Sequence, residues 1–242
     1  MKWRKLLFIL FIISLTVWNG GVNAFAMNTG FSTNEMNSKD QHTFLSNINL
    51  SLISDEPQKN SIVCFDVSNS GLIAIGSETS ENNFISVYAV TGEFKYGYVF
   101  NCNQSFGVQW DGINLIIYFV RSDVAALFDP KGANIELRTI EDTIDNNSYW
   151  NHVVFSKEKI VNGNRYTIKN TMGFLNFFAS SYSQLIETDS DGNETIIYDF
   201  STTQTTRTIL VFIAVFIFVT FVIAIIIWQF LKAKNTGNGF SC

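Results

Sequence analysis

An uninterrupted apolar stretch near the end of the chain restricts what this sequence can fold into more than any other feature. Thr208 to Leu231 contains 24 residues without a charge, and Arg207 and Lys232 flank it. As an α-helix this stretch would be about 36 Å long at 1.5 Å per residue, enough to cross a hydrocarbon core of about 30 Å with some tilt. We therefore predict one transmembrane helix over residues 208–231, with the lipid bilayer as its partner.

The residues around this stretch indicate how it sits in the membrane. Lys232 and Lys234 follow it directly, and basic residues are enriched on the cytoplasmic side of membrane helices. Residues 232–242 are therefore expected to form a short cytoplasmic tail. Residues 201–207, Ser-Thr-Thr-Gln-Thr-Thr-Arg, are polar and are interpreted as an extended stalk that holds the preceding domain close to the bilayer.

The first 26 residues have the three parts of a secretory signal. Three basic residues open it, and an uncharged apolar run follows over Leu6–Val17. Val22-Asn23-Ala24 and Ala24-Phe25-Ala26 both satisfy the small-x-small rule for signal peptidase. We predict that residues 1–26 are a helical signal peptide that is removed after export; an uncleaved N-terminal anchor is the alternative. The protein is then a single-pass protein of the cell membrane with its N-terminal domain outside.

The charges of the chain are divided unevenly among these segments. All 21 acidic residues lie between Met27 and Arg207 together with 11 of the 16 basic ones, so this part carries 11 − 21 = −10. Such acidity argues against a nucleic-acid partner, because phosphate backbones require basic surfaces. The acids are scattered along the sequence, which favours a soluble exported surface over a cation site.

The part between the two apolar segments has the pattern of an all-β domain. Residues 27–43 are polar and are expected to form a flexible lead-in, whereas residues 44–200 alternate short apolar runs with Gly, Asn and Asp turns. The candidate strands are Ile48–Ile53, Ile62–Val67, Leu72–Ile75, Phe84–Val90, Phe94–Phe100, Phe106–Trp110, Ile113–Phe119, Val124–Phe128, Ile135–Ile140, Trp150–Phe155, Tyr166–Lys169, Leu185–Thr188 and Thr195–Phe200.

A hairpin pattern recurs three times in this domain. Its turn glycines are Gly92, Gly132 and Gly192, and each is followed eight residues later by a bulky apolar residue. Glycine supplies the positive φ that a tight hairpin turn requires. The first two glycines are 40 residues apart and the last two are 60 apart, so the pattern predicts an insertion of about twenty residues within 142–182.

Four strands in about 40 residues is the period of a β-propeller blade. Ile85 to Phe94, Ile-Ser-Val-Tyr-Ala-Val-Thr-Gly-Glu-Phe, resembles the outer hairpin of the NHL and YVTN-like β-propellers. The match covers about residues 60–200 and implies a partial propeller-like array of short antiparallel strands that serves as a binding platform, with no catalytic residue. Three blades are fewer than a ring usually has. An open array, an assembly of copies and another β-sandwich therefore remain alternatives.

Few residues of the domain are candidates for special chemistry. Cys64 and Cys102 lie 38 residues apart, and after export such a pair can form a disulfide of about 3–4 kcal/mol. The alternative is that Cys64, within Ile-Val-Cys-Phe, is a small buried hydrophobe. His42 and His152 stand alone in the sequence, so no metal site and no cofactor are predicted.

These features favour a non-catalytic role. We expect a membrane-anchored surface protein that binds a ligand or another membrane or surface protein, with self-association as a further option. The asparagine-rich, proline-poor composition is typical of AT-rich bacterial genomes. Two other hypotheses remain: an exported sensory or accessory subunit of a membrane complex, and an extracytoplasmic glycan-acting enzyme. The enzyme hypothesis requires converging carboxylates, for which Glu141 and Asp111 are the candidates.

Overall fold

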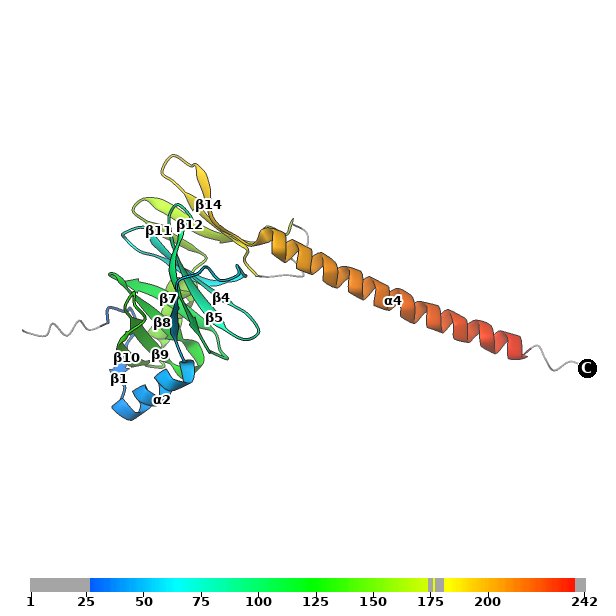
Figure 1. Ribbon diagram of the computed structural model, residues 1–242, viewed down its shortest axis with the longest axis horizontal. Helices are drawn as coiled ribbons and strands as arrows, with labels where there is room; N and C mark the ends of the chain where they lie inside the picture. The colour runs from blue at the N-terminus through cyan, green and yellow to red at the C-terminus, as the bar shows by residue number, and fades with distance from the viewer. Residues whose placement is uncertain (1–26, 174–175, 177–180, 238–242) are drawn as a thin grey trace, which may run out of the picture.

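The computed structural model describes residues 27–173, 176 and 181–237, and it consists of three antiparallel sheets followed by one long helix (Figure 1). The mostly-β prediction is therefore confirmed. The predicted signal peptide over 1–26 lies outside the described residues, as does the end of the predicted tail.

The first sheet is a meander of four strands with a fifth short strand at its outer edge. Each strand pairs with the next one in the chain, and β2 pairs with the last of the four. Its strands are β2 (Ser51–Ile53), β3 (Ile62–Val67), β4 (Leu72–Glu78), β5 (Asn83–Ala89) and β6 (Phe94–Phe100).

The second sheet has the same order, again with a short strand from an earlier part of the chain at its edge. Here β1 pairs with β10, so the N-terminal segment completes the sheet. Its strands are β1 (Thr33–Glu35), β7 (Phe106–Asp111), β8 (Asn114–Phe119), β9 (Val124–Phe128) and β10 (Asn134–Ile140).

The third sheet is a four-stranded meander without an added edge strand among the described residues. A hairpin turn at Gly192 joins its last two strands, as turns at Gly92 and Gly132 do in the other sheets, and the φ angles are +87°, +80° and +83°. All three glycines therefore lie in the turn between the third and fourth strands of a meander. The strands are β11 (Glu158–Val161), β12 (Asn164–Lys169), β13 (Gln184–Thr188) and β14 (Glu194–Asp199).

The lead-in predicted for residues 27–43 is wrong, because this segment contains β1 and most of helix α2 (Ser38–Ile48). Asn37 caps the helix by accepting a hydrogen bond from the backbone N–H of Asp40 at 3.0 Å. The predicted strand Ile48–Ile53 is reduced to β2, because α2 extends through Ile48. The first two turns of α2 are polar and mostly solvent-exposed, so no apolar period announces them.

The predicted strand Trp150–Phe155 is also wrong. Helix α3 (Ile144–Tyr149) begins at the N-cap Thr143 and continues into the π-helical turn η2 (Trp150–Val154). This helical segment falls within the predicted insertion. It packs closely on the second sheet at Gly107, where a Cβ would overlap a methyl carbon of Val154, so only glycine fits.

Both faces of the first sheet are buried. Side chains on one face, among them Cys64, Ile85 and Val87, belong to a cluster shared with the second sheet. Phe65 and Ile73 point to the opposite face, because side chains alternate along a strand, and they pack with the third sheet. The outer face of the second sheet is covered by the N-terminal segment and by η2. The first sheet is thus enclosed between the other two.

One buried carboxylate links β3, β7 and β11, the strands that begin the three four-stranded meanders. Asp66 on β3 accepts a hydrogen bond from the backbone N–H of Trp110 on β7 at 2.7 Å. Its other oxygen pairs with the Lys159 ammonium on β11 at 2.6 Å, and the Asp66 and Lys159 side chains are only 11% and 12% exposed. The Trp110 indole N–H also donates to the backbone oxygen of Asp66 at 3.3 Å.

Helix α4 (Ser201–Gly237) begins directly after β14, so the extended stalk predicted for 201–207 is wrong. Gln204 in its first turns is buried, and its amide nitrogen donates to the backbone oxygen of Ser181 at 3.0 Å. Arg207 donates to the side-chain oxygen of Asn60 at 3.4 Å and lies over the ring of Phe200. The start of the helix is therefore docked on the β domain.

The rest of α4 extends away from the β domain (Figure 1). Residues Ser201–Gln229 are long and apolar enough to cross a membrane. The most apolar 18-residue stretch within them has a mean hydropathy of 3.4, and none of it is buried inside the protein. This agrees with the predicted membrane span, although the helix begins seven residues before Thr208. An exposed apolar helix of this length is stable only where lipid or a partner covers it.

Replacing Asp66 with Asn is expected to lower the free energy of unfolding by about 3–5 kcal/mol. The amide can still accept from Trp110, but the Lys159 ammonium stays buried without a counter-charge. Urea unfolding of the full chain in detergent, followed by tryptophan fluorescence, measures this loss. Glu194→Gln is the matched control: its pair with Lys169 is about half exposed and should contribute at most about 1 kcal/mol. Equal effects of the two variants would contradict this role of Asp66.

The stability of the domain is expected to fall above about pH 9. Burial raises the pKa of the Cys64 thiol to about 12 and is the main cause that raises the pKa of several tyrosines above their usual value near 10. The unfolded chain then releases protons at a pH where the folded chain keeps them, so stability is full below pH 9 and is lost as pH rises. Urea midpoints between pH 7 and 11 test this, with tyrosinate absorbance as the second readout. Full ionisation of the tyrosines near pH 10 in the folded protein would contradict it. The tyrosines concerned are Tyr88, Tyr98, Tyr118 and Tyr198.

Candidate functional site

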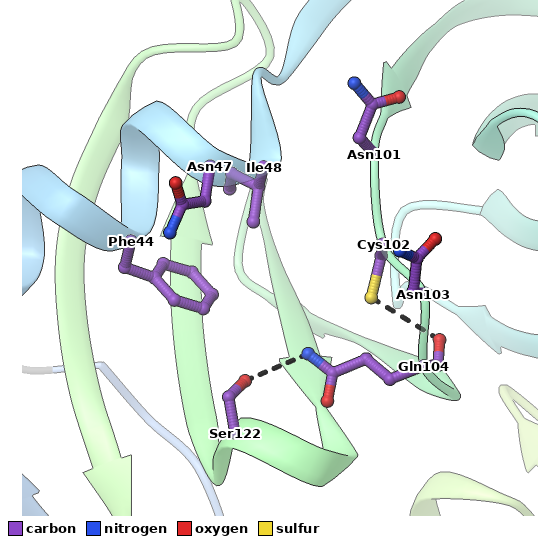
Figure 2. A pocket seen from close by; sticks show the side chains of 8 residues that line it. All are labelled: Phe44, Asn47, Ile48, Asn101, Cys102, Asn103, Gln104 and Ser122. Carbon is purple, nitrogen blue, oxygen red and sulfur yellow. Dashed lines mark hydrogen bonds between the residues drawn. The ribbon is translucent and has the colours of Figure 1, made fainter.

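The candidate site is a pocket of about 330 Å³ between the C-terminal end of α2, the β6–β7 loop (residues 101–105) and the short 3₁₀ turn η1 (Val120–Ser122) (Figure 2). Three segments that are distant in sequence therefore form its wall. The lining residues are Phe44, Asn47, Ile48, Asn101, Cys102, Asn103, Gln104 and Ser122.

The apolar side of the pocket is fixed by α2. The ring of Phe44 packs edge-on against Phe119 with centroids 5.0 Å apart, and it is half-buried rather than enclosed. The backbone N–H of Asn101 donates to the oxygen of Ile48 at 2.8 Å, which ties the β6–β7 loop to the end of the helix. Asn49 ends α2 in the left-handed conformation with a φ of +45°.

The polar side of the pocket contains an acceptor that the protein leaves without a partner. The amide nitrogen of Gln104 donates to the hydroxyl of Ser122 at 3.1 Å (Figure 2). Its amide oxygen is buried and accepts no hydrogen bond from the described residues. Such an atom costs free energy unless a donor reaches it, and the amide oxygen of Gln204 in α4 is likewise buried without a partner among the described residues.

The thiol of Cys102 has a structural contact rather than a catalytic one. It donates to the backbone oxygen of Gln104 at 3.4 Å, and burial raises its pKa, so the neutral thiol persists at neutral pH. None of the eight lining residues carries a charge. The pocket therefore has hydrogen-bonding groups and an aromatic face but neither a general base nor an activated nucleophile.

A second hollow of about 270 Å³ lies on the other side of the β6–β7 loop. It shares Cys102, Asn103 and Gln104 with the first pocket and adds the β4–β5 turn, residues 78–83. The side-chain amide of Asn83 donates to the backbone oxygen of Cys102 at 2.7 Å and holds the loop in place. The two hollows together make an amide-rich surface in which only Glu78 and Glu81 are charged.

The residues that the sequence singled out do not form this site as a set. Cys102 lines both hollows, whereas Cys64 is buried and pairs with Gly76 inside the first sheet. Both thiols are free, so the predicted disulfide is not formed. Cys64 lies on β3, and Cys102 follows β6. Three inter-strand spacings of about 4.8 Å separate these two strands, which is more than the 4.4–6.8 Å between the Cα atoms of a disulfide.

The carboxylates proposed for an enzyme do not converge in a described pocket. Asp111 lines a third hollow of about 570 Å³ with Gly112, Ile113 and Ile135, but Glu141 does not line it. The turn glycines Gly92, Gly132 and Gly192 lie in their hairpins and line none of the three hollows.

The amides that line the pocket were not predicted from the sequence: Asn47, Asn101, Asn103 and Gln104. In an asparagine-rich chain an isolated amide carries little signal. The side chains come together only because α2 ends beside the loop that joins the first two sheets. A buried amide oxygen without a partner is visible only in three dimensions.

Neither related proteins nor a metal cluster assigns a function to this site. Comparison with protein-family models, curated proteins and solved structures finds no match to this chain. Within the part of the chain that the structure describes, no three His, Cys, Asp or Glu side chains gather closely enough to hold a metal ion. The chemistry of the pocket itself is therefore the basis for a functional proposal.

Cys64 and Cys102 are expected to remain reduced in the folded protein. Replacing Cys102 with Ser should then change the free energy of unfolding by less than about 1 kcal/mol, and dithiothreitol should leave the urea midpoint unchanged. Loss of about 3–4 kcal/mol on reduction would instead reveal a disulfide and contradict the free thiols of the structure. Alkylation of the unfolded chain before and after reduction counts the free thiols directly.

Proposed function

We propose that this chain is a membrane-anchored, extracytoplasmic protein that binds an uncharged, hydroxyl-rich ligand without catalysing a reaction on it. The observation that carries the proposal is the buried amide oxygen of Gln104, which has no partner among the described residues. A sugar hydroxyl fits such an acceptor, and the half-buried ring of Phe44 can pack against the apolar face of a sugar ring. Neutral glycans are therefore the proposed ligand class.

The charge distribution supports an exported orientation of the β domain. The domain from Met27 to Arg207 carries −10, whereas Lys232 and Lys234 follow the apolar part of α4. Basic residues stay on the cytoplasmic side, which leaves the β domain outside and residues 232–242 inside. The basic and apolar segments of residues 1–26 agree with export by a signal peptide.

The arrangement of the sheets supports a partial propeller. The first strands β3, β7 and β11 meet through Asp66, and each sheet extends outward as a meander. The segment α3–η2 lies between the second and third sheets in chain order, and η2 is next to both β3 and β7. We propose that this helical segment takes the position that a fourth blade would occupy in a closed ring.

A role as an accessory or sensory subunit of a membrane complex is the second candidate. The observation that favours it is the docked start of α4, where Gln204 and Arg207 bond the β domain. A change in the β domain would therefore reach the membrane helix without a flexible stalk in between. A glycan-acting enzyme has less support, because it needs two carboxylates at the scissile bond and the Gln104 pocket is lined by none.

Gln104→Ala is expected to weaken binding of a neutral oligosaccharide about five- to tenfold, because one buried hydrogen bond is lost. The probes are immobilised tetrasaccharides of glucose and of N-acetylglucosamine, and binding of the full chain in detergent is measured by surface plasmon resonance. Phe44→Ala should weaken binding by a similar factor.

Gln184→Ala is the matched control, since this glutamine bonds Asp199 on the third sheet and lies outside the described pockets. It should leave binding unchanged. Absence of binding of the wild-type chain to every neutral oligosaccharide would contradict the proposed ligand class. Equal loss in Gln184→Ala would contradict the proposed site.

A further inference from the structure

The N-terminal segment is docked from the first described residue onward. The side chain of Met27 is 6% exposed and packs in the cluster that covers the outer face of the second sheet, with Phe31 and Trp150. The backbone nitrogen of Met27 donates to a carboxylate oxygen of Glu136 on β10 at 2.5 Å. The next backbone nitrogen, of Asn28, donates to Asp111 at the end of β7 at 3.0 Å. Two carboxylates therefore hold the first two nitrogens of this segment.

The charges around these nitrogens do not balance. Glu136 also pairs with Arg138, whose Nε lies 2.6 Å from the other carboxylate oxygen, and both side chains are about four-fifths buried. The ion pairs described for residues 27–173 and 181–237 do not include Asp111. The site thus has two carboxylates and one guanidinium, a net charge of −1.

We propose that signal peptidase cleaves the chain between Ala26 and Met27 and that the new α-ammonium group of Met27 forms an ion pair with Glu136. The inference rests on the export included in the proposed function. In the cleavage, water adds across the peptide bond, its C–N bond breaks, Ala26 leaves as a carboxylate, and the Met27 amine takes up a proton.

The docked position of Met27 distinguishes the two cleavage sites that the sequence permits. Ala24-Phe25-Ala26 places the cut directly before Met27, where the ammonium meets Glu136. A cut after Ala24 would leave Phe25 and Ala26 in front, so the ammonium would lie up to about 7 Å further along the chain. The Met27 nitrogen would then remain a neutral amide. A charged donor makes the stronger hydrogen bond to a carboxylate, so cleavage after Ala26 stabilises the docked segment and β1 behind it.

The first test is the N-terminal sequence of the full chain after expression in a secreting bacterial host and purification from the membrane. The expected sequence starts at Met27 as Met-Asn-Thr-Gly-Phe. A start at Phe25 would overturn the inference and leave the export hypothesis intact. A chain that retains Met1 to Ala26 would contradict both the inference and the cleaved-signal orientation of the proposed function.

The second test measures the pKa of the α-amine through its rate of acylation at several pH values, followed by mass spectrometry of the N-terminal peptide. A free α-amine titrates near pH 8, and a carboxylate partner raises this value. The groups that face the amine are Glu136, Arg138 and Asp111. We expect Glu136→Gln to increase the acylation rate at pH 7 about tenfold, which corresponds to about one pKa unit.

Three variants keep this test decisive. Arg138→Gln removes a competing positive charge, so it should slow acylation or leave it unchanged, whereas Glu194→Gln on the third sheet should have no effect. If Glu136→Gln fails to fold, Asp111→Asn is measured instead and should increase the rate by a smaller factor. Equal acylation rates in the wild type and in the folded variant at this site would overturn the ion pair.

Discussion

The ion pair between Asp66 and Lys159 is the interaction on which the arrangement of this domain depends. Three sheets that are each built from local hairpins meet at this one carboxylate, through an ammonium from β11 and a backbone N–H of Trp110 on β7. A buried charge tolerates little displacement, because each lost contact leaves a desolvated group behind. We therefore infer that the carboxylate specifies how the sheets meet, whereas the apolar clusters between them supply most of the favourable burial.

Local features of the structure could be predicted from the sequence, and contacts between distant segments could not. Period-two patterns and turn glycines predicted most strands, and length and hydropathy predicted the apolar helix, because these signals lie within about ten to twenty residues. Helix α2 was missed because its polar first turns carry no apolar period, and α3–η2 because Trp150–Phe155 is short enough to suit either structure. The polar residues 201–207 looked like a stalk, but burial of Gln204 against Ser181 makes them the start of α4.

The candidate site could not be predicted from the sequence for the same reason, because it depends on contacts between distant segments. Its amides come from α2 and from the loop between the first two sheets, with the Ser122 hydroxyl from η1, so no single stretch of sequence contains it. The pocket carries no charge, although the domain has a net charge of −10. It contains the unpartnered amide oxygen of Gln104 and the aromatic ring of Phe44. That combination suits a neutral ligand. The docked start of α4 fixes the β domain, and with it this pocket, next to the first turns of the apolar helix.

The proposed function has one premise above all others: the β domain lies outside the membrane and the C-terminal tail inside. Labelling with a membrane-impermeant maleimide tests this premise most directly, in a Cys64→Ala, Cys102→Ser background where Cys242 is the remaining cysteine. In intact cells Cys242 should stay unlabelled until the membrane is permeabilised, whereas a cysteine placed at the exposed Ser70 of the β3–β4 turn should be labelled at once. Labelling of Cys242 and protection of position 70 in intact cells would contradict the exported orientation and the binding role built on it.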